Sequence, residues 1–156
     1  MGDIQVSIIG DKSVRNALDN LRVLATDHPS EANRILAKGL KEGGKYLIRK
    51  GRARARAGIN ANRSKYPNVV HNGNLLRSFT NRVKRNNSGV IVGFYQGSKG
   101  DRRNGQHAHL VDLGHNGQRG PARGSHFWTT TKSADTGAAL VKVEEGVTAA
   151  VFKILH

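Results

Sequence analysis

Histidines are the residues of this chain whose type and spacing most readily suggest chemistry. His107, His109, His115 and His126 lie close together in the sequence, with Asp112 among them. On a strand, a His-x-His pair places both rings on one face, and a carboxylate could complete a zinc or iron site. Against this, the chain has no HExxH motif, no cysteine and only one nearby carboxylate, so solvated histidines beside a glycine-rich loop explain the pattern better. We therefore expect no metal and no other cofactor.

A nuclease is the enzymatic alternative, because the chain is basic and rich in histidine. His109 or His115 would act as the general base, and Arg119 or Arg123 would stabilise the transition-state charge. Metal-dependent nucleases need several acidic ligands, which the middle of this chain lacks. A metal-independent ribonuclease remains an alternative, although we expect a protein that is not an enzyme.

Positive charge is the dominant feature of the composition. The formal net charge is +15, and no Asp or Glu occurs from Gly43 to Gly100. A surface with one sign of charge indicates a polyanionic or acidic partner. The candidate contacts with DNA or with an acidic protein ring are Arg52, Arg54, Arg56, Arg63, Lys65, Lys99, Arg102 and Arg103.

Other functional classes leave no trace in the sequence. There is no phosphate-binding loop, no serine nucleophile elbow and no helix-turn-helix, RNP or zinc-finger pattern. There is also no signal-peptide pattern and no apolar stretch long enough to span a bilayer. We expect a protein made in the cytoplasm, with no membrane partner.

The first half of the chain predicts a strand followed by two helices. Apolar and polar residues alternate over residues 4–8, which is the period of a half-buried strand. Helical spacing then predicts a first helix that ends just before Pro29, and a second that runs from Pro29 to about Arg56. Gly58 would stop this second helix, and an irregular loop would continue to Asn74.

Arg52, Arg54 and Arg56 alternate with small residues near the predicted end of the long helix. Three residues at this spacing cannot share one helical face. The pattern therefore indicates a fraying helix end or a strand-like extension.

The second half predicts a small sheet and a final helix. Residues 79–83 and 90–94 favour strands joined by a hairpin turn, followed by a basic loop over 96–106. Residues 107–113 fit a short helix or a strand, and a glycine-rich loop follows over 114–125. Residues 138–155 fit an amphipathic helix better than a pair of strands, despite their many valines.

The expected fold class is α+β, in a single domain over residues 1–156. It would contain an N-terminal strand and helices (one of them long), a small antiparallel sheet with long basic loops, and a C-terminal helix.

Four short motifs occur in a fixed order in this chain. They are the segment from Gly73 to Phe79 (Gly-Asn-Leu-Leu-Arg-Ser-Phe), Val90–Gly93, the segment from Ala108 to Gly114 (Ala-His-Leu-Val-Asp-Leu-Gly), and Pro121-Ala122-Arg123 with Phe127 shortly after. In this order the chain resembles the HK97 gp10-like family of tail-completion and neck proteins of long-tailed bacteriophages, with its virion-morphogenesis relatives. The resemblance covers most of the chain from about Ala32 onward.

The resemblance implies a non-enzymatic virion subunit that forms a homo-oligomeric ring at the head–tail junction, around the DNA channel. Implied partners are a head-closure or adaptor ring and the tail terminator or tail tube, with non-specific contact to genomic double-stranded DNA. The tail terminator itself is the alternative within this class, and a basic sequence-independent nucleic-acid-binding protein is the alternative outside it.

Asp112 lies in an apolar motif flanked by basic segments. An Arg of the same or a neighbouring subunit could pair with it, and Arg77 and Arg123 are the candidates. The expected structural and intersubunit residues are therefore Arg77, Asp112, Arg123 and Phe127.

Overall fold

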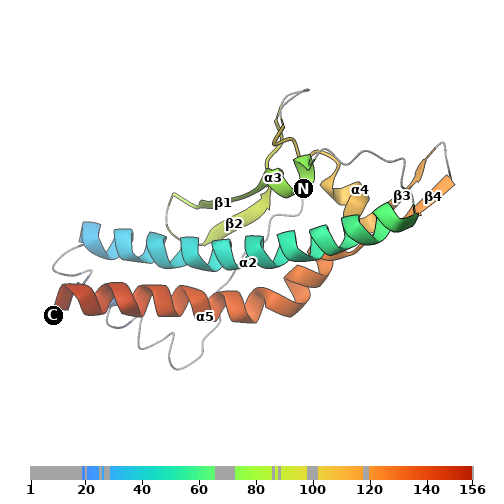
Figure 1. Cartoon of the computed structure of the whole chain (residues 1–156). Helices are drawn as coiled ribbons and strands as arrows, with labels where there is room; N and C mark the ends of the chain where they lie inside the picture. The colour runs from blue at the N-terminus through green and yellow to red at the C-terminus, as the bar shows by residue number, and fades with distance from the viewer. Residues whose placement is uncertain are drawn as a thin grey trace. The chain divides into compact units, whose positions relative to one another are not determined.

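The structure is a computed structural model and describes residues 19, 21–24, 26, 29–65, 73–85, 87, 89–97, 102–117 and 120–155. The fold class is α+β, as predicted. Figure 1 shows the elements, which in chain order are α2 (Pro29–Lys65), α3 (Asn74–Ser78), β1 (Phe79–Val83), β2 (Val90–Phe94), α4 (Ala108–Leu113), β3 (Gly114–Gly117), β4 (Gly120–Arg123) and α5 (Phe127–Leu155).

The chain divides into two compact units. Unit 1 comprises Met1–Tyr46, Asn81–Ile91 and Thr136–His156, and unit 2 comprises Leu47–Thr80 and Val92–Asp135. The helices α2 and α5 and the strands β1 and β2 each contribute residues to both units. The single-domain prediction stays a prediction.

In unit 1, the helices α2 and α5 pack closely through small residues. A Cβ atom added to Gly43 would lie 2.5 Å from Val143 Cγ2 and 2.9 Å from the carbonyl oxygen of Ala139. Gly39 has the same relation to Val143 and Val147. The buried apolar side chains of this unit are Leu21, Leu24, Ala32, Ile35, Leu40, Val90, Ala139, Val143, Val147 and Val151.

The strands β1 and β2 form the predicted two-stranded sheet. At the turn, the Lys84 amide donates to the Gly89 carbonyl at 3.0 Å and the Asn87 amide donates to the Lys84 carbonyl at 2.9 Å. The Asn87 side chain also donates to the backbone oxygen of Asn33 in α2. Both strands have the predicted bounds, residues 79–83 and 90–94.

The long helix begins at Pro29 as predicted, but its predicted end is wrong. Helix α2 continues to Lys65, through the segment expected to be a fraying end and the start of a loop. Gly58 lies inside the helix, where a Cβ atom would come within 3.1 Å of Ser125 Cβ. The glycine thus permits close packing inside a helix, and the Arg and Ala residues around it favour helix.

Two further predictions require correction. The glycine-rich loop over 114–125 contains an antiparallel hairpin, in which Gly114 pairs with Arg123 and Gly117 with Gly120. The final helix is confirmed, but α5 begins at Phe127 rather than near residue 138.

The remaining predictions concern residues 107–113 and the N-terminal strand and helix. Residues 107–113, left open between helix and strand, contribute the helix α4. Residues 21–24 are helical, whereas the strand expected over residues 4–8 lies outside the described residues. Within the part of the chain that the structure describes, no helix is both long and apolar enough to cross a membrane.

Candidate functional site

An aromatic cluster lies at the centre of unit 2. Phe79 begins β1, Phe94 ends β2, and Phe127 and Trp128 begin α5. The ring centroids of Phe79 and Phe94 are 4.7 Å apart, and that of Trp128 lies 5.4 Å from Phe94. Tilted and edge-to-face pairs of this kind stabilise a core beyond the area that they bury. The cluster joins the ends of three elements that are remote in sequence.

Ser78 anchors the first motif beneath this cluster. Its side chain is fully buried, and its hydroxyl donates to the Leu75 carbonyl at 2.7 Å. The Tyr95 amide donates to the Ser78 carbonyl, also at 2.7 Å. Gly105 packs directly against the Ser78 side chain, so any larger residue at position 105 would displace it. The serine is therefore a packing residue rather than a nucleophile.

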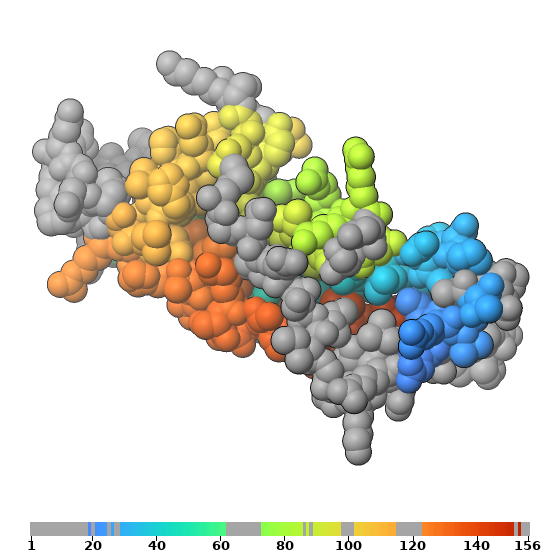
Figure 2. All heavy atoms as spheres, turned by 180° about the vertical axis from the view of Figure 1, so that it is seen from behind, coloured from blue at the N-terminus to red at the C-terminus, as the bar shows by residue number. Residues whose placement is uncertain are grey.

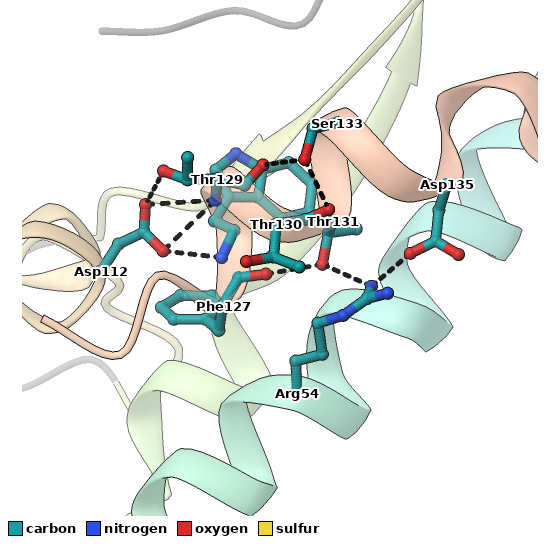
Figure 3. A network of polar contacts seen from close by, with 9 residues as sticks. Arg54, Asp112, Phe127, Thr129, Thr130, Thr131, Ser133 and Asp135 are labelled. Carbon is teal, nitrogen blue, oxygen red and sulfur yellow. Dashed lines mark hydrogen bonds and ion pairs between the residues drawn. The ribbon is translucent and has the colours of Figure 1, made fainter.

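Asp112 of α4 caps the start of α5. Its carboxylate accepts hydrogen bonds from the Trp128 amide at 2.6 Å and from the Thr129 amide at 3.2 Å, and from the Thr129 hydroxyl at 2.7 Å (Figure 3). The first amides of a helix have no partner within it, and the helix dipole favours negative charge there. Asp112 supplies that partner and charge from a different element.

Backbone hydrogen bonds reinforce the junction between α4 and α5. The Ser125 amide donates to the Val111 carbonyl at 2.9 Å, and the His126 amide donates to the Asp112 carbonyl at 2.8 Å. Gly124 lies so close to the Asp112 carbonyl that a Cβ atom there would overlap it. The helix α5 therefore begins at Phe127 because α4 holds its first turn in place.

A second polar contact joins α2 to α5 within unit 2. Arg54 forms an ion pair with Asp135, and its guanidinium donates to the Thr131 hydroxyl at 3.1 Å (Figure 3). The Thr131 hydroxyl in turn donates to the Phe127 carbonyl at 2.6 Å. The Asp135 side chain is 10% exposed and that of Arg54 31% exposed, so this pair is largely withdrawn from solvent.

The residues expected to pair across an interface occupy different environments. Phe127 is buried in the aromatic cluster, whereas Arg77 and Arg123 are exposed. Among the described residues Asp112 pairs with neither arginine, because its carboxylate is directed at the first amides of α5. The proposed Asp112–arginine pair within one chain is therefore replaced by a helix cap.

The predicted basic contacts separate into three groups. Arg52, Arg56, Arg102 and Arg103 are exposed, although Arg52 also donates to the Leu76 carbonyl at 2.9 Å. Arg54 pairs with Asp135 and is therefore not one of the exposed basic residues. Lys99 and the side chains of Arg63 and Lys65 lie outside the described residues.

The alternating arginines of α2 do not mark a fraying helix end. One regular helix can place some of them on its exposed face and another against α5. Arg52 and Arg56 lie on exposed positions, while Arg54 is turned towards α5. No fraying is needed to explain the spacing.

The histidines that the structure describes lie at exposed positions. His107, His109 and His126 are exposed, and the side chain of His115 lies outside the described residues. No group of three or more His, Cys, Asp or Glu residues within the described ranges could hold a metal ion. Asp112, the carboxylate considered for such a site, caps α5 instead.

Positive charge is concentrated in one unit. Unit 2 contains 14 Lys and Arg residues against three acids, a net charge of +11, whereas unit 1 contains 12 against eight, a net charge of +4. Two of the three acids of unit 2, Asp112 and Asp135, are buried. The third acid of unit 2, Asp101, lies outside the described residues.

Sequence reasoning missed the contacts that hold this unit together. Thr129, Thr131 and Asp135 carry no local signal, because their partners Asp112 and Arg54 are 17 to 81 residues away. Tyr95 was also missed, although Arg103 stacks over its ring with 4.9 Å from the guanidinium carbon to the ring centroid. An aromatic residue shortly before two consecutive arginines was the signal available in the sequence.

Comparisons with protein-family models, with curated proteins and with solved structures found no match for this chain.

Proposed function

We propose that this chain is a non-enzymatic structural protein of a tailed bacteriophage, a tail-completion or neck subunit that forms a ring at the head–tail junction. One observation carries the proposal. Three of the four resembled motifs, which are separate in sequence, supply residues that hold unit 2 together. Ser78 and Phe79 of the first motif, Asp112 of the third and Phe127 of the fourth all contribute to its packing.

This use of the motif residues supports a scaffold role. A buried serine that bonds its own helix and an aspartate that caps a neighbouring helix leave no reactive group exposed at these positions. A family that shares such motifs shares a way of building the unit rather than a reaction. A ring follows when the same subunit surface pair is repeated around a closed rotation.

The implied neighbours are a head-closure or adaptor ring on one side and the tail terminator or tail tube on the other. Both would meet a subunit whose charge is concentrated in unit 2. The protein would therefore reside in the virion neck, after synthesis in the bacterial host.

The deciding experiment is to interrupt the reading frame in the phage or prophage that encodes this chain and to image the lysate by negative-stain microscopy. We expect DNA-filled heads and finished tails that are not joined, and recovery of joined particles when the wild-type chain is supplied. Normally joined virions would overturn the proposal. Tails of abnormal length would overturn it in favour of a tail terminator.

The purified chain provides a second test against the enzymatic alternative. It should have no ribonuclease activity, with or without His109. Degradation of RNA that is lost in His109→Ala would contradict the structural role.

A further inference from the structure

We propose that unit 2 binds the phosphate backbone of duplex nucleic acid, and that unit 1 does not. The centre of this surface is an arginine platform, defined as the exposed residues Arg52, Arg77, Arg102 and Arg103 with the ring of Tyr95. The inference rests on the proposed function only where it identifies the duplex as the phage genome. The binding itself is a property of the isolated chain.

A continuous set of contacts places the platform around α3. The Arg52 guanidinium donates to the Leu76 carbonyl at 2.9 Å and lies 5.8 Å from the centre of the Phe79 ring. Arg77 is the next residue of α3 and is exposed. Thus Arg52 of α2 contacts the residue of α3 that directly precedes Arg77.

Backbone hydrogen bonds join the segments after β2 to the end of α3. The Tyr95 amide bonds the Ser78 carbonyl, and the Gly105 amide donates to the Tyr95 carbonyl at 2.8 Å. Arg103 stacks on the ring of Tyr95, and Tyr95 is 41% exposed. In Figure 2 the gold atoms of residues 102–113 adjoin the yellow atoms of β2 on one face.

Two arginines of the platform have a restricted side-chain orientation. Arg52 is held by hydrogen bonds to backbone oxygens and Arg103 by stacking on an aromatic ring. Stacking and planar hydrogen bonding suit a guanidinium better than an ammonium group. Less side-chain entropy is lost when such arginines bind a phosphate, because their orientation is already restricted.

The charge distribution favours nucleic acid over an acidic protein. Ten of the 14 basic residues of unit 2 are Arg, against five of 12 in unit 1. Arg forms bidentate contacts with phosphate oxygens, and protein–DNA interfaces are strongly positive throughout. The core of a protein–protein interface also contains Arg, but it combines it with several aromatic and apolar anchors. Among the described residues of unit 2, the large exposed apolar side chains are Tyr95 and Leu113.

The test compares two charge-matched triple variants of the full chain. One carries Arg77→Gln, Arg102→Gln and Arg103→Gln in unit 2. The control carries Arg22→Gln, Arg82→Gln and Arg85→Gln, which removes three exposed arginines from unit 1. Binding to a fluorescent duplex of mixed sequence is measured by anisotropy across a salt series, after thermal unfolding has shown that both variants fold.

We expect the wild-type chain to bind the duplex with an affinity that falls as salt rises, by about 0.9 log units per log unit of salt for each phosphate contacted. The unit 2 variant should lose about tenfold or more in affinity, and its salt slope should decrease by about two to three. The unit 1 variant should stay within about twofold of wild type. Equal losses in both variants, or no binding by the wild type at low salt, would overturn the inference.

Two further measurements make the outcome specific. Tyr95→Leu should weaken duplex binding because Arg103 loses its stacking partner, whereas Tyr95→Phe should retain it. Polyglutamate should compete poorly with the duplex at equal charge concentration, and competition as strong as that of unlabelled duplex would indicate an acidic protein partner and overturn the inference.

Failure of this inference can be told apart from failure of the proposed function. If the unit 2 variant binds DNA as well as wild type but unjoined heads and tails still accumulate without the gene, only the inference is wrong. If DNA binding behaves as expected but virions form normally without the gene, only the proposed function is wrong.

Discussion

Asp112 is the residue whose chemistry the structure redefines most. The residue is 6% exposed, and its carboxylate accepts hydrogen bonds from the first amides of α5. We expect Asp112→Ala to lower the free energy of unfolding by about 2–4 kcal/mol, because charge-assisted hydrogen bonds and a helix cap are lost together. Urea denaturation of the purified chain measures this loss.

The matched control for Asp112 is Asp19→Ala, the same chemical change at an exposed acid. It should change stability by less than about 0.5 kcal/mol. Asp112→Asn should fall between the two, since it keeps one acceptor oxygen but not the charge. If Asp112→Ala were as mild as the control, the capping role would be wrong.

Arg54 and Asp135 form the second contact that decides stability at this scale. Arg54→Met should cost about 2 kcal/mol, because it leaves the largely buried Asp135 carboxylate without its cation. The double variant Arg54→Met with Asp135→Leu should be more stable than Arg54→Met alone, since the uncompensated charge is also removed. Thermal and urea unfolding of the two single variants and the double variant complete the cycle, and strict additivity would show that the two side chains do not interact.

At the level of elements, glycines decide how α2 and α5 approach in unit 1. Gly43 faces Val143 and the Ala139 carbonyl, whereas nothing lies within 4 Å of a Cβ added to Gly137. Gly43→Ala should therefore destabilise by about 1–3 kcal/mol through overpacking. Gly137→Ala should instead stabilise by about 0.5–1 kcal/mol, because alanine favours helix and meets no neighbour.

Both glycine substitutions are read out by the midpoint of urea unfolding, with helix content checked by circular dichroism. Because they make the same change in helices of the same unit, the difference between them isolates packing. Equal shifts in one direction would mean that helix propensity, and not the approach of the two helices, sets the outcome.

Elements with a local signal were predicted well from the sequence. Residues 79–83 alternate weakly, residues 90–94 are a run rich in valine and isoleucine, and Pro29 marks the start of α2. The start of α5 could not be predicted, because the residue that caps it is Asp112, in another element. The role of Gly58 could not be predicted for a similar reason. This glycine leaves room for Ser125, which is remote in sequence, and does not end a helix.

In the candidate site, too, features that depend on composition could be predicted, whereas features that depend on contacts remote in sequence could not. One-sided charge is a property of composition, so the basic surface could be predicted, including exposed Arg52, Arg56, Arg102 and Arg103. The withdrawal of Arg54 into a pair with Asp135 required contacts across 81 residues, which no spacing rule supplies. The hairpin of β3 and β4 also lacked a signal, because glycines and a proline replace the usual alternation of a strand.

At the scale of the whole molecule, the uneven charge has a cost in stability. Unit 2 carries +11 of the net charge of +15, while unit 1 balances its charges better and includes the surface pairs Glu31–Arg34, Glu42–Lys45 and Lys142–Glu145. Like charges on one compact unit repel each other and destabilise it unless they are screened or bound. A partner that neutralises unit 2 would therefore also stabilise it.

Salt should reveal this repulsion in the isolated chain. Raising sodium chloride from about 20 mM to about 300 mM shortens the screening length below the spacing of many surface charges, so we expect the melting temperature to rise by about 2–4 °C. The variant that lacks Arg77, Arg102 and Arg103 should begin with a higher melting temperature and respond less to salt. The variant that lacks Arg22, Arg82 and Arg85 should respond almost as the wild type does, because unit 1 contains opposing acids. A melting temperature that is unchanged or falls with salt in the wild-type chain would show that the arginines of unit 2 do not strain the fold.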